Sequence, residues 1–123
     1  MSMRLDWKYL VLALAIAVVA AYFDLPKALG AHPWWSRQVV MVGAGVGLIV
    51  VFGASLLHHK WVLLWGAVIT LVASAAAATY GKAQFAASYA EDAFAGQLWF
   101  FGWIGICFGA VTSISLFRAA RRP

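Results

Sequence analysis

LWFFGWIGICFGAVTSISLF, residues Leu98 to Phe117, is the stretch that decides the fold predicted for this chain. It contains no charged side chain, and an apolar helix of about 20 residues is long enough to cross the hydrocarbon core of a bilayer. Small residues recur in it at steps of three and four, which places them on one side of a helix. We therefore predict a membrane helix that packs against a neighbouring helix through the side formed by these small residues.

Three further apolar segments resemble this one. Hydrophobic residues make up 65% of the chain and charged residues only 11%, whereas a soluble domain has about 25% charged residues. This composition predicts an all-α membrane protein with four transmembrane helices in a single transmembrane domain, residues 1–123. The predicted spans are residues 7–24, 39–57, 61–80 and 98–117, and the predicted outer loops are residues 25–38 and 81–97.

Glycine, alanine and threonine mark the helix faces that we expect to pack together. The second span contains a GxxxG pair, a pattern that lets two membrane helices approach closely. The third span has so many small residues that we place it at the centre of the bundle. The predicted helix-packing residues are Gly43, Gly47 and Ala54 in the second span, Gly66, Thr70, Ala73 and Ala77 in the third, and Gly102, Gly105, Gly109 and Thr112 in the last.

The two outer loops contain most of the candidate interaction residues. Residues 81–97 are rich in alanine, which favours a helix, and their aromatic side chains would form one apolar edge. We therefore predict a short amphipathic helix at the membrane surface before the last span. The candidate residues for binding a partner or the membrane interface are Trp34, Trp35, Phe85, Tyr89, Trp99 and Trp103.

Basic residues predict the orientation in the membrane. With both termini in the cytoplasm (N-in/C-in), six of the nine basic residues lie on that side and three on the other, which agrees with the positive-inside rule. The predicted location is the bacterial inner (cytoplasmic) membrane. The basic residues stand singly at the ends of apolar runs rather than on one face, so nucleic-acid binding is disfavoured. The cytoplasmic group is Arg4, Lys8, Lys60, Arg118, Arg121 and Arg122, and the outer group is Lys27, Arg37 and Lys82.

Few residues of this sequence are candidates for metal binding, cofactor binding or catalysis. His58 and His59 are weak candidates for a metal site, but His32 lies on the opposite side in the predicted topology, so one chain cannot bracket a haem between them. Cys107 lies within the last span and is interpreted as a small apolar filler. The sequence indicates no cofactor, although bound lipid is expected.

Three hypotheses for the function remain open. The first is a non-catalytic accessory or structural subunit of a larger membrane complex, with other membrane subunits and lipid as partners. The second is a small homo-oligomeric transporter or channel for ions or small amphiphiles. The third is an enzyme or carrier that acts on lipid headgroups at the outer interface, in which His32 or Arg37 would be essential.

Overall fold

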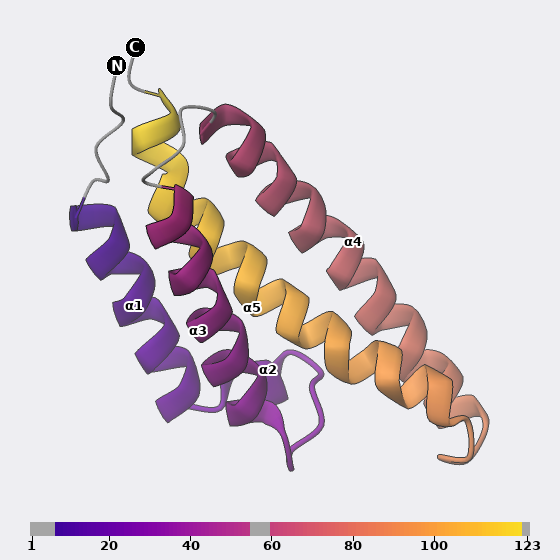
Figure 1. Cartoon of the computed structure of the whole chain (residues 1–123). Helices are drawn as coiled ribbons and strands as arrows, with labels where there is room; N and C mark the ends of the chain where they lie inside the picture. The colour runs from indigo at the N-terminus through magenta and orange to yellow at the C-terminus, as the bar shows by residue number, and fades with distance from the viewer. Residues whose placement is uncertain (1–6, 55–59, 122–123) are drawn as a thin grey trace.

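A computed structural model describes residues 7–54 and 60–121 of the chain. Most of these residues are helical and none of them forms a strand, which confirms the all-α prediction. Three helices, α3, α4 and α5, are long and apolar enough to cross a membrane, and α1 is a shorter apolar helix (Figure 1). The protein is therefore a multi-pass membrane protein. The helices are α1 (Trp7–Tyr22), α2 (Leu25–Ala28), α3 (Ser36–Ala54), α4 (Lys60–Ala87) and α5 (Ala93–Arg121).

Helix α5 is the centre of the structure, because it packs against α1, α3 and α4 and most extensively against α4. Helix α4 lies at the edge: 17% of the span Trp61–Ala87 is buried, against 33% of the span Ala93–Phe117. The prediction that the third span is central is therefore wrong. Small residues allow close approach on more than one side of α4, but α5 covers only one of those sides.

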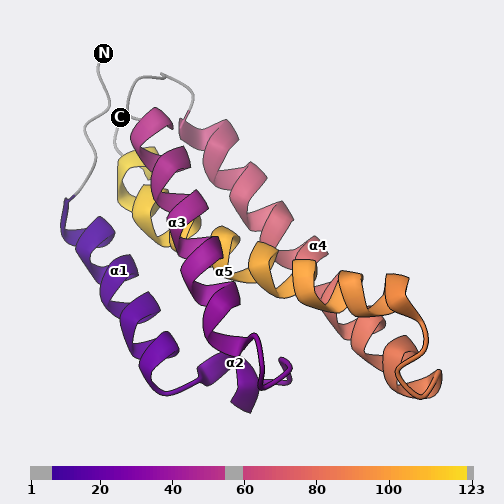
Figure 2. The same ribbon diagram turned by 60° about the horizontal axis from the view of Figure 1, so that its bottom comes forward.

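Three hydrophobic clusters follow one another along α5. The first joins α1, α3, α4 and α5 near the end where α1 begins and α5 ends. The second joins α1, α3 and α5, and the third joins α4 and α5 to the start of α3 and to the segment between α2 and α3. The hairpin of α4 and α5 diverges from α1 and α3 toward the end that holds α2 (Figures 1 and 2). The buried members of the clusters are Leu10, Val51, Leu64 and Leu116; then Ala13, Ala44 and Val111; then Ala31, Val39, Ala78, Trp99 and Trp103.

The predicted separate helix at the membrane surface is wrong. Residues 81–97 are largely helical, but α4 continues through Ala87 and α5 already begins at Ala93. Gly81 explains the continuation, since a Cβ added there would lie 2.6 Å from the backbone nitrogen of Trp99. The two helices therefore remain in close contact beyond the predicted membrane boundary. The reversal between them is a short turn in which Tyr89 and Ala90 have φ values of 56° and 66°.

Candidate functional site

An aromatic cluster joins the segment between α2 and α3 to the first half of α5. The ring of His32 lies 5.4 Å from Trp34, 5.9 Å from Trp35 and 5.6 Å from Trp99, measured between ring centroids. Trp35 and Trp99 meet edge to face at 5.2 Å, an arrangement that aromatic rings favour. The cluster therefore packs the segment against α5 in a defined position.

Hydrogen bonds hold the same segment in place. The indole Nε1 of Trp99 donates to the backbone oxygen of Gly30 at 3.1 Å. The backbone nitrogen of Lys27 donates to the hydroxyl of Ser36, which is fully buried, at 3.0 Å. Nδ1 of His32 accepts from the backbone nitrogen of Trp34 at 3.1 Å. This ring nitrogen is therefore engaged in a turn within the segment.

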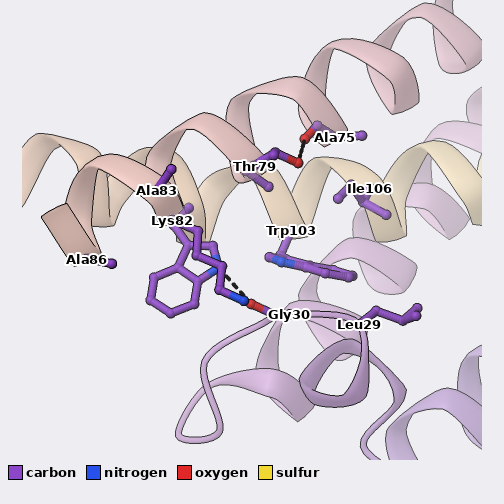
Figure 3. Close-up of a pocket in the computed structure, with 11 residues that line it drawn as sticks. Leu29, Gly30, Ala75, Thr79, Lys82, Ala83, Ala86, Trp103 and Ile106 are labelled. Carbon is purple, nitrogen blue, oxygen red and sulfur yellow. Dashed lines mark hydrogen bonds between the residues drawn. The ribbon is translucent and has the colours of Figure 1, made fainter.

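A groove of about 560 Å³ lies beside this cluster, between the segment and the hairpin of α4 and α5. Figure 3 shows Leu29 and Gly30 on one side of it and the side chains of α4 on the other. Lys82 is the one charged residue that lines the groove, and the hydroxyl of Thr79 donates to the backbone oxygen of Ala75 at 2.8 Å. The remaining lining residues are Ala78, Ala83, Ala86, Trp99, Trp103 and Ile106.

Lys82 reaches from α4 across to Gly30. Its Nζ lies 3.2 Å from the position that a Cβ on Gly30 would occupy, and the side chain is largely exposed. Within residues 7–54 and 60–121, Lys82 makes no hydrogen bond and no ion pair. Arg37 differs, because its Nε lies 3.2 Å from Oδ1 of Asp24. The ammonium group of Lys82 therefore lies at the groove without an acidic partner among the described residues.

The predicted packing residues of α5 and α3 lie at helix contacts. A Cβ on Gly102 or Gly109 would lie 2.8 Å from the Cβ of Ala78 or of Leu71, respectively, and one on Gly105 would overlap the side chain of Ser74. On α3, Gly43 packs against Cys107, while Gly47 packs against Thr112 and Val111. Cys107 is thus in contact with a glycine at a helix crossing, where a small side chain is required.

The predicted stripe on α4 lies beside the contact with α5, not at its centre. A Cβ on Gly66 would meet no atom within 4 Å, the hydroxyl of Thr70 donates to the oxygen of Gly66 at 2.8 Å, and Ala73 is exposed. The residues of α4 that contact α5 lie one position later along the helix: Ala67, Leu71, Ser74, Ala78 and Gly81. Adjacent positions on a helix point about 100° apart. The stripe Gly66, Thr70, Ala73 and Ala77 therefore lies to one side of this contact, and its members Ala73 and Ala77 line a second groove together with Leu98, Phe101 and Gly102 of α5.

The candidate interface residues divide into two groups. Trp34 and Tyr89 are 89% and 92% exposed, so both present their rings at the surface. Trp35, Phe85, Trp99 and Trp103 pack within the third hydrophobic cluster instead. The weak metal candidates His58 and His59 lie outside the described residues, as does the side chain of Ala54.

The polar groups near the two connecting segments, between α1 and α3 and between α4 and α5, have separate roles. Arg37 pairs with Asp24 and also donates through Nε to the backbone oxygen of Ala21 at 3.1 Å. Asp92 accepts through Oδ1 from the backbone nitrogen of Ala95 at 3.0 Å and so caps α5. In the part of the chain that the structure describes, no three His, Cys, Asp or Glu residues are grouped as a metal would require.

No family model, curated protein or solved structure matches this chain. The class of protein is therefore assigned from the length and composition of its helices. These define a small all-helical, multi-pass membrane protein with three long candidate spans and a shorter apolar helix at the N-terminal side.

Proposed function

We propose that the protein is a non-catalytic accessory subunit of a larger membrane complex. The observation that carries this proposal is the open stripe on α4, formed by Gly66, Thr70, Ala73 and Ala77. Lipid tails are as apolar as leucine side chains, so membrane helices associate through close packing at small residues. Helix α4 has 28 residues and packs mainly on α5. Its small-residue stripe lies beside that contact and is open along the groove at Ala73 and Ala77, so it is suited to receive a helix of another subunit.

The composition of the spans supports the same proposal. Residues 39–57, 61–80 and 98–117 contain no Asp, Glu, Lys, Arg or His. Pumps and coupled transporters keep such residues at membrane depth, where they carry protons or bind ions. Spans that lack these ionisable residues favour a protein that associates with other membrane helices.

We further propose that α1 is the fourth span and that both termini are cytoplasmic. Helix α1 packs against α3 and α5, and its start lies at the same end of the bundle as the end of α5 (Figure 1). With α1 inserted beside these spans, the segment between α2 and α3 and the turn between α4 and α5 face the cell exterior or periplasm.

Purification of the tagged chain in mild detergent tests the accessory-subunit proposal. Wild-type protein and Ala76→Leu should retain the same co-purifying membrane protein, whereas Ala73→Leu should lose it. Ala73 and Ala76 are both exposed on α4, but only Ala73 lies on the stripe, so the pair is matched in size and helix position. Recovery of the wild-type chain as an isolated monomer in several detergents would overturn the proposal.

A homo-oligomeric channel is the second candidate, and one observation favours it. Among the described residues, the buried hydroxyls of Thr112, Ser113 and Ser115 on α5 have no hydrogen-bond partner. These hydroxyls are buried within one chain, so a path along them requires that assembly of several copies opens the contacts around α5. Flux of ions and small amphiphiles through liposomes that contain only this chain tests the idea, and no flux for any of them would exclude it.

A further inference from the structure

We infer that the groove beside Lys82 binds one anionic glycerophospholipid, with the lipid phosphate at the ammonium group and an acyl chain along α4 and α5. This inference does not depend on the proposed function. It rests on the depth of the groove, on the chemistry of its walls and on the charge at its rim.

The depth of the groove follows from the length of α4. Lys82 lies 21 residues after Trp61, which corresponds to about 32 Å along a helix. The hydrocarbon core of a bilayer is about 30 Å thick. With Trp61 at one interface, where indole side chains are enriched, Lys82 therefore reaches the opposite headgroup layer. Ala75 lies about 10 Å deeper, at the level of the acyl chains.

The walls of the groove are largely apolar below the ammonium group of Lys82. Ala75, Ala78 and Ile106 line the deeper part, and Thr79 satisfies its hydroxyl within α4. Trp103 lies between α4 and the segment that contains Leu29, as Figure 3 shows. A ligand that fits these walls has a charged end at the interface and a hydrocarbon chain below it.

The charge at the rim selects an anionic headgroup. Lys82 is the one charged residue lining the groove, and no described acidic residue pairs with it. The Trp99 indole is already bonded to Gly30, so the ammonium of Lys82 is the donor left for a phosphate. The lining residues offer no carboxylate for the ammonium group of a zwitterionic lipid, so phosphatidylglycerol should be preferred to phosphatidylcholine.

Lipid retention measured by native mass spectrometry tests this inference. The purified full chain would be incubated with an equimolar mixture of phosphatidylglycerol and phosphatidylcholine. Wild-type protein should retain phosphatidylglycerol selectively. Lys82→Gln should weaken that binding about fivefold, because a lysine near an anionic lipid surface contributes about 1 kcal/mol. Lys82→Arg, which keeps the charge, should restore it.

Two further variants separate binding in the groove from attraction to any exposed positive charge. Lys27→Gln removes an exposed charge of the same kind from α2, outside the groove lining, and should leave retention unchanged. Ala75→Phe fills the deeper part of the groove and should reduce lipid retention without removing a charge. If Lys27→Gln and Lys82→Gln lose the same amount of bound phosphatidylglycerol, the binding depends on the net charge of the protein and not on the groove, and the inference is overturned.

Competition identifies the source of the phosphate. Inorganic phosphate in millimolar excess should not displace the retained lipid, because it cannot use the apolar walls. Displacement of the lipid by inorganic phosphate would assign the site to a free anion and overturn the inference. Dimerisation that protects Lys82 from amine modification in the absence of lipid would assign the groove to a second copy and overturn it equally.

Discussion

Individual glycines decide how closely the two longest helices approach. At Gly102 an added Cβ would lie 2.7 Å from the backbone nitrogen of Ala78, a distance that real side chains do not adopt. The neighbouring atoms belong to a helix backbone, which cannot rotate away. The contact between α4 and α5 therefore depends on the missing side chain at this residue, whereas Gly66 has open space around it.

Gly102→Val should destabilise the folded chain by about 1–3 kcal/mol, since overpacking a tight contact costs that much. Gly66→Val, the matched control on α4, should change the free energy of unfolding by less than about 0.5 kcal/mol, as is usual for surface positions. Reversible unfolding in mixed micelles, monitored by tryptophan fluorescence, measures both. Equal effects of the two substitutions would contradict the assigned contact.

A single indole nitrogen connects the segment between α2 and α3 to α5. Trp99→Phe keeps an aromatic ring in the cluster but removes the hydrogen bond to Gly30, a loss of about 1 kcal/mol. The backbone amide of Ala31, which donates to Pro26 at 2.7 Å, should then exchange with deuterium about fivefold faster. Trp34→Phe alters an exposed ring and should leave that exchange rate unchanged. If it does not, the hydrogen bond is not what holds the segment.

At the scale of elements, the hairpin of α4 and α5 is closed by side-chain hydrogen bonds. The hydroxyl of Ser88 donates to the backbone oxygen of Phe85 at 3.0 Å and accepts from the backbone nitrogen of Asp92 at 2.9 Å. Asp92 in turn caps α5 through Ala95. These bonds satisfy backbone groups that a helix end would otherwise leave unpaired.

Asp92→Ala should lower the free energy of unfolding by about 0.5–2 kcal/mol, the usual cost of removing an N-terminal cap. Glu91→Ala removes the adjacent exposed carboxylate and leaves the cap intact, so it should have a smaller effect. Chemical unfolding in detergent compares the two variants. Amide exchange at Ala95 should also increase only in Asp92→Ala, and an increase in both would contradict the capping role.

The helices themselves could be predicted from the sequence, but their ends and facing sides could only be predicted in part. Apolar length and the small residues of α3 and α5 predicted membrane helices and real contacts at Gly43, Gly102 and Gly109. On α4 two adjacent stripes are rich in small residues, and local sequence cannot decide which one α5 covers. The end of α4 was also missed, because the close contact at Gly81 depends on a partner helix that is distant in sequence.

The groove was not predicted from the sequence. The sequence indicates Lys82 only as one basic residue of a predicted outer loop. Its relation to Gly30 depends on the fold of a segment more than 50 residues away. One sequence signal was available: a lysine one bilayer thickness after Trp61 on a continuous helical pattern. That signal requires α4 to continue past residue 80, which the predicted loop boundary excluded.

At the scale of the whole molecule, the orientation can be tested by labelling. In a Cys107→Ala background, Tyr89→Cys should react with a membrane-impermeant maleimide in intact cells. Lys8→Cys should react only after the cells are permeabilised, since five basic residues against three still favour the cytoplasm for that end. The reverse pattern would show that both termini face outward, and reaction of both residues in intact cells would show that α1 does not span.

The helices of this molecule differ greatly in length. Helix α1 has 16 residues and α4 has 28, which correspond to about 24 Å and 42 Å. With α1 inserted as the proposed fourth span, a bilayer of about 30 Å becomes thinner beside it, while the longer α4 meets the bilayer by tilting or by projecting beyond it. The surrounding lipid is therefore deformed unequally around the protein. Such an inclusion lowers the elastic energy of the bilayer by collecting where thin and thick regions of a membrane meet.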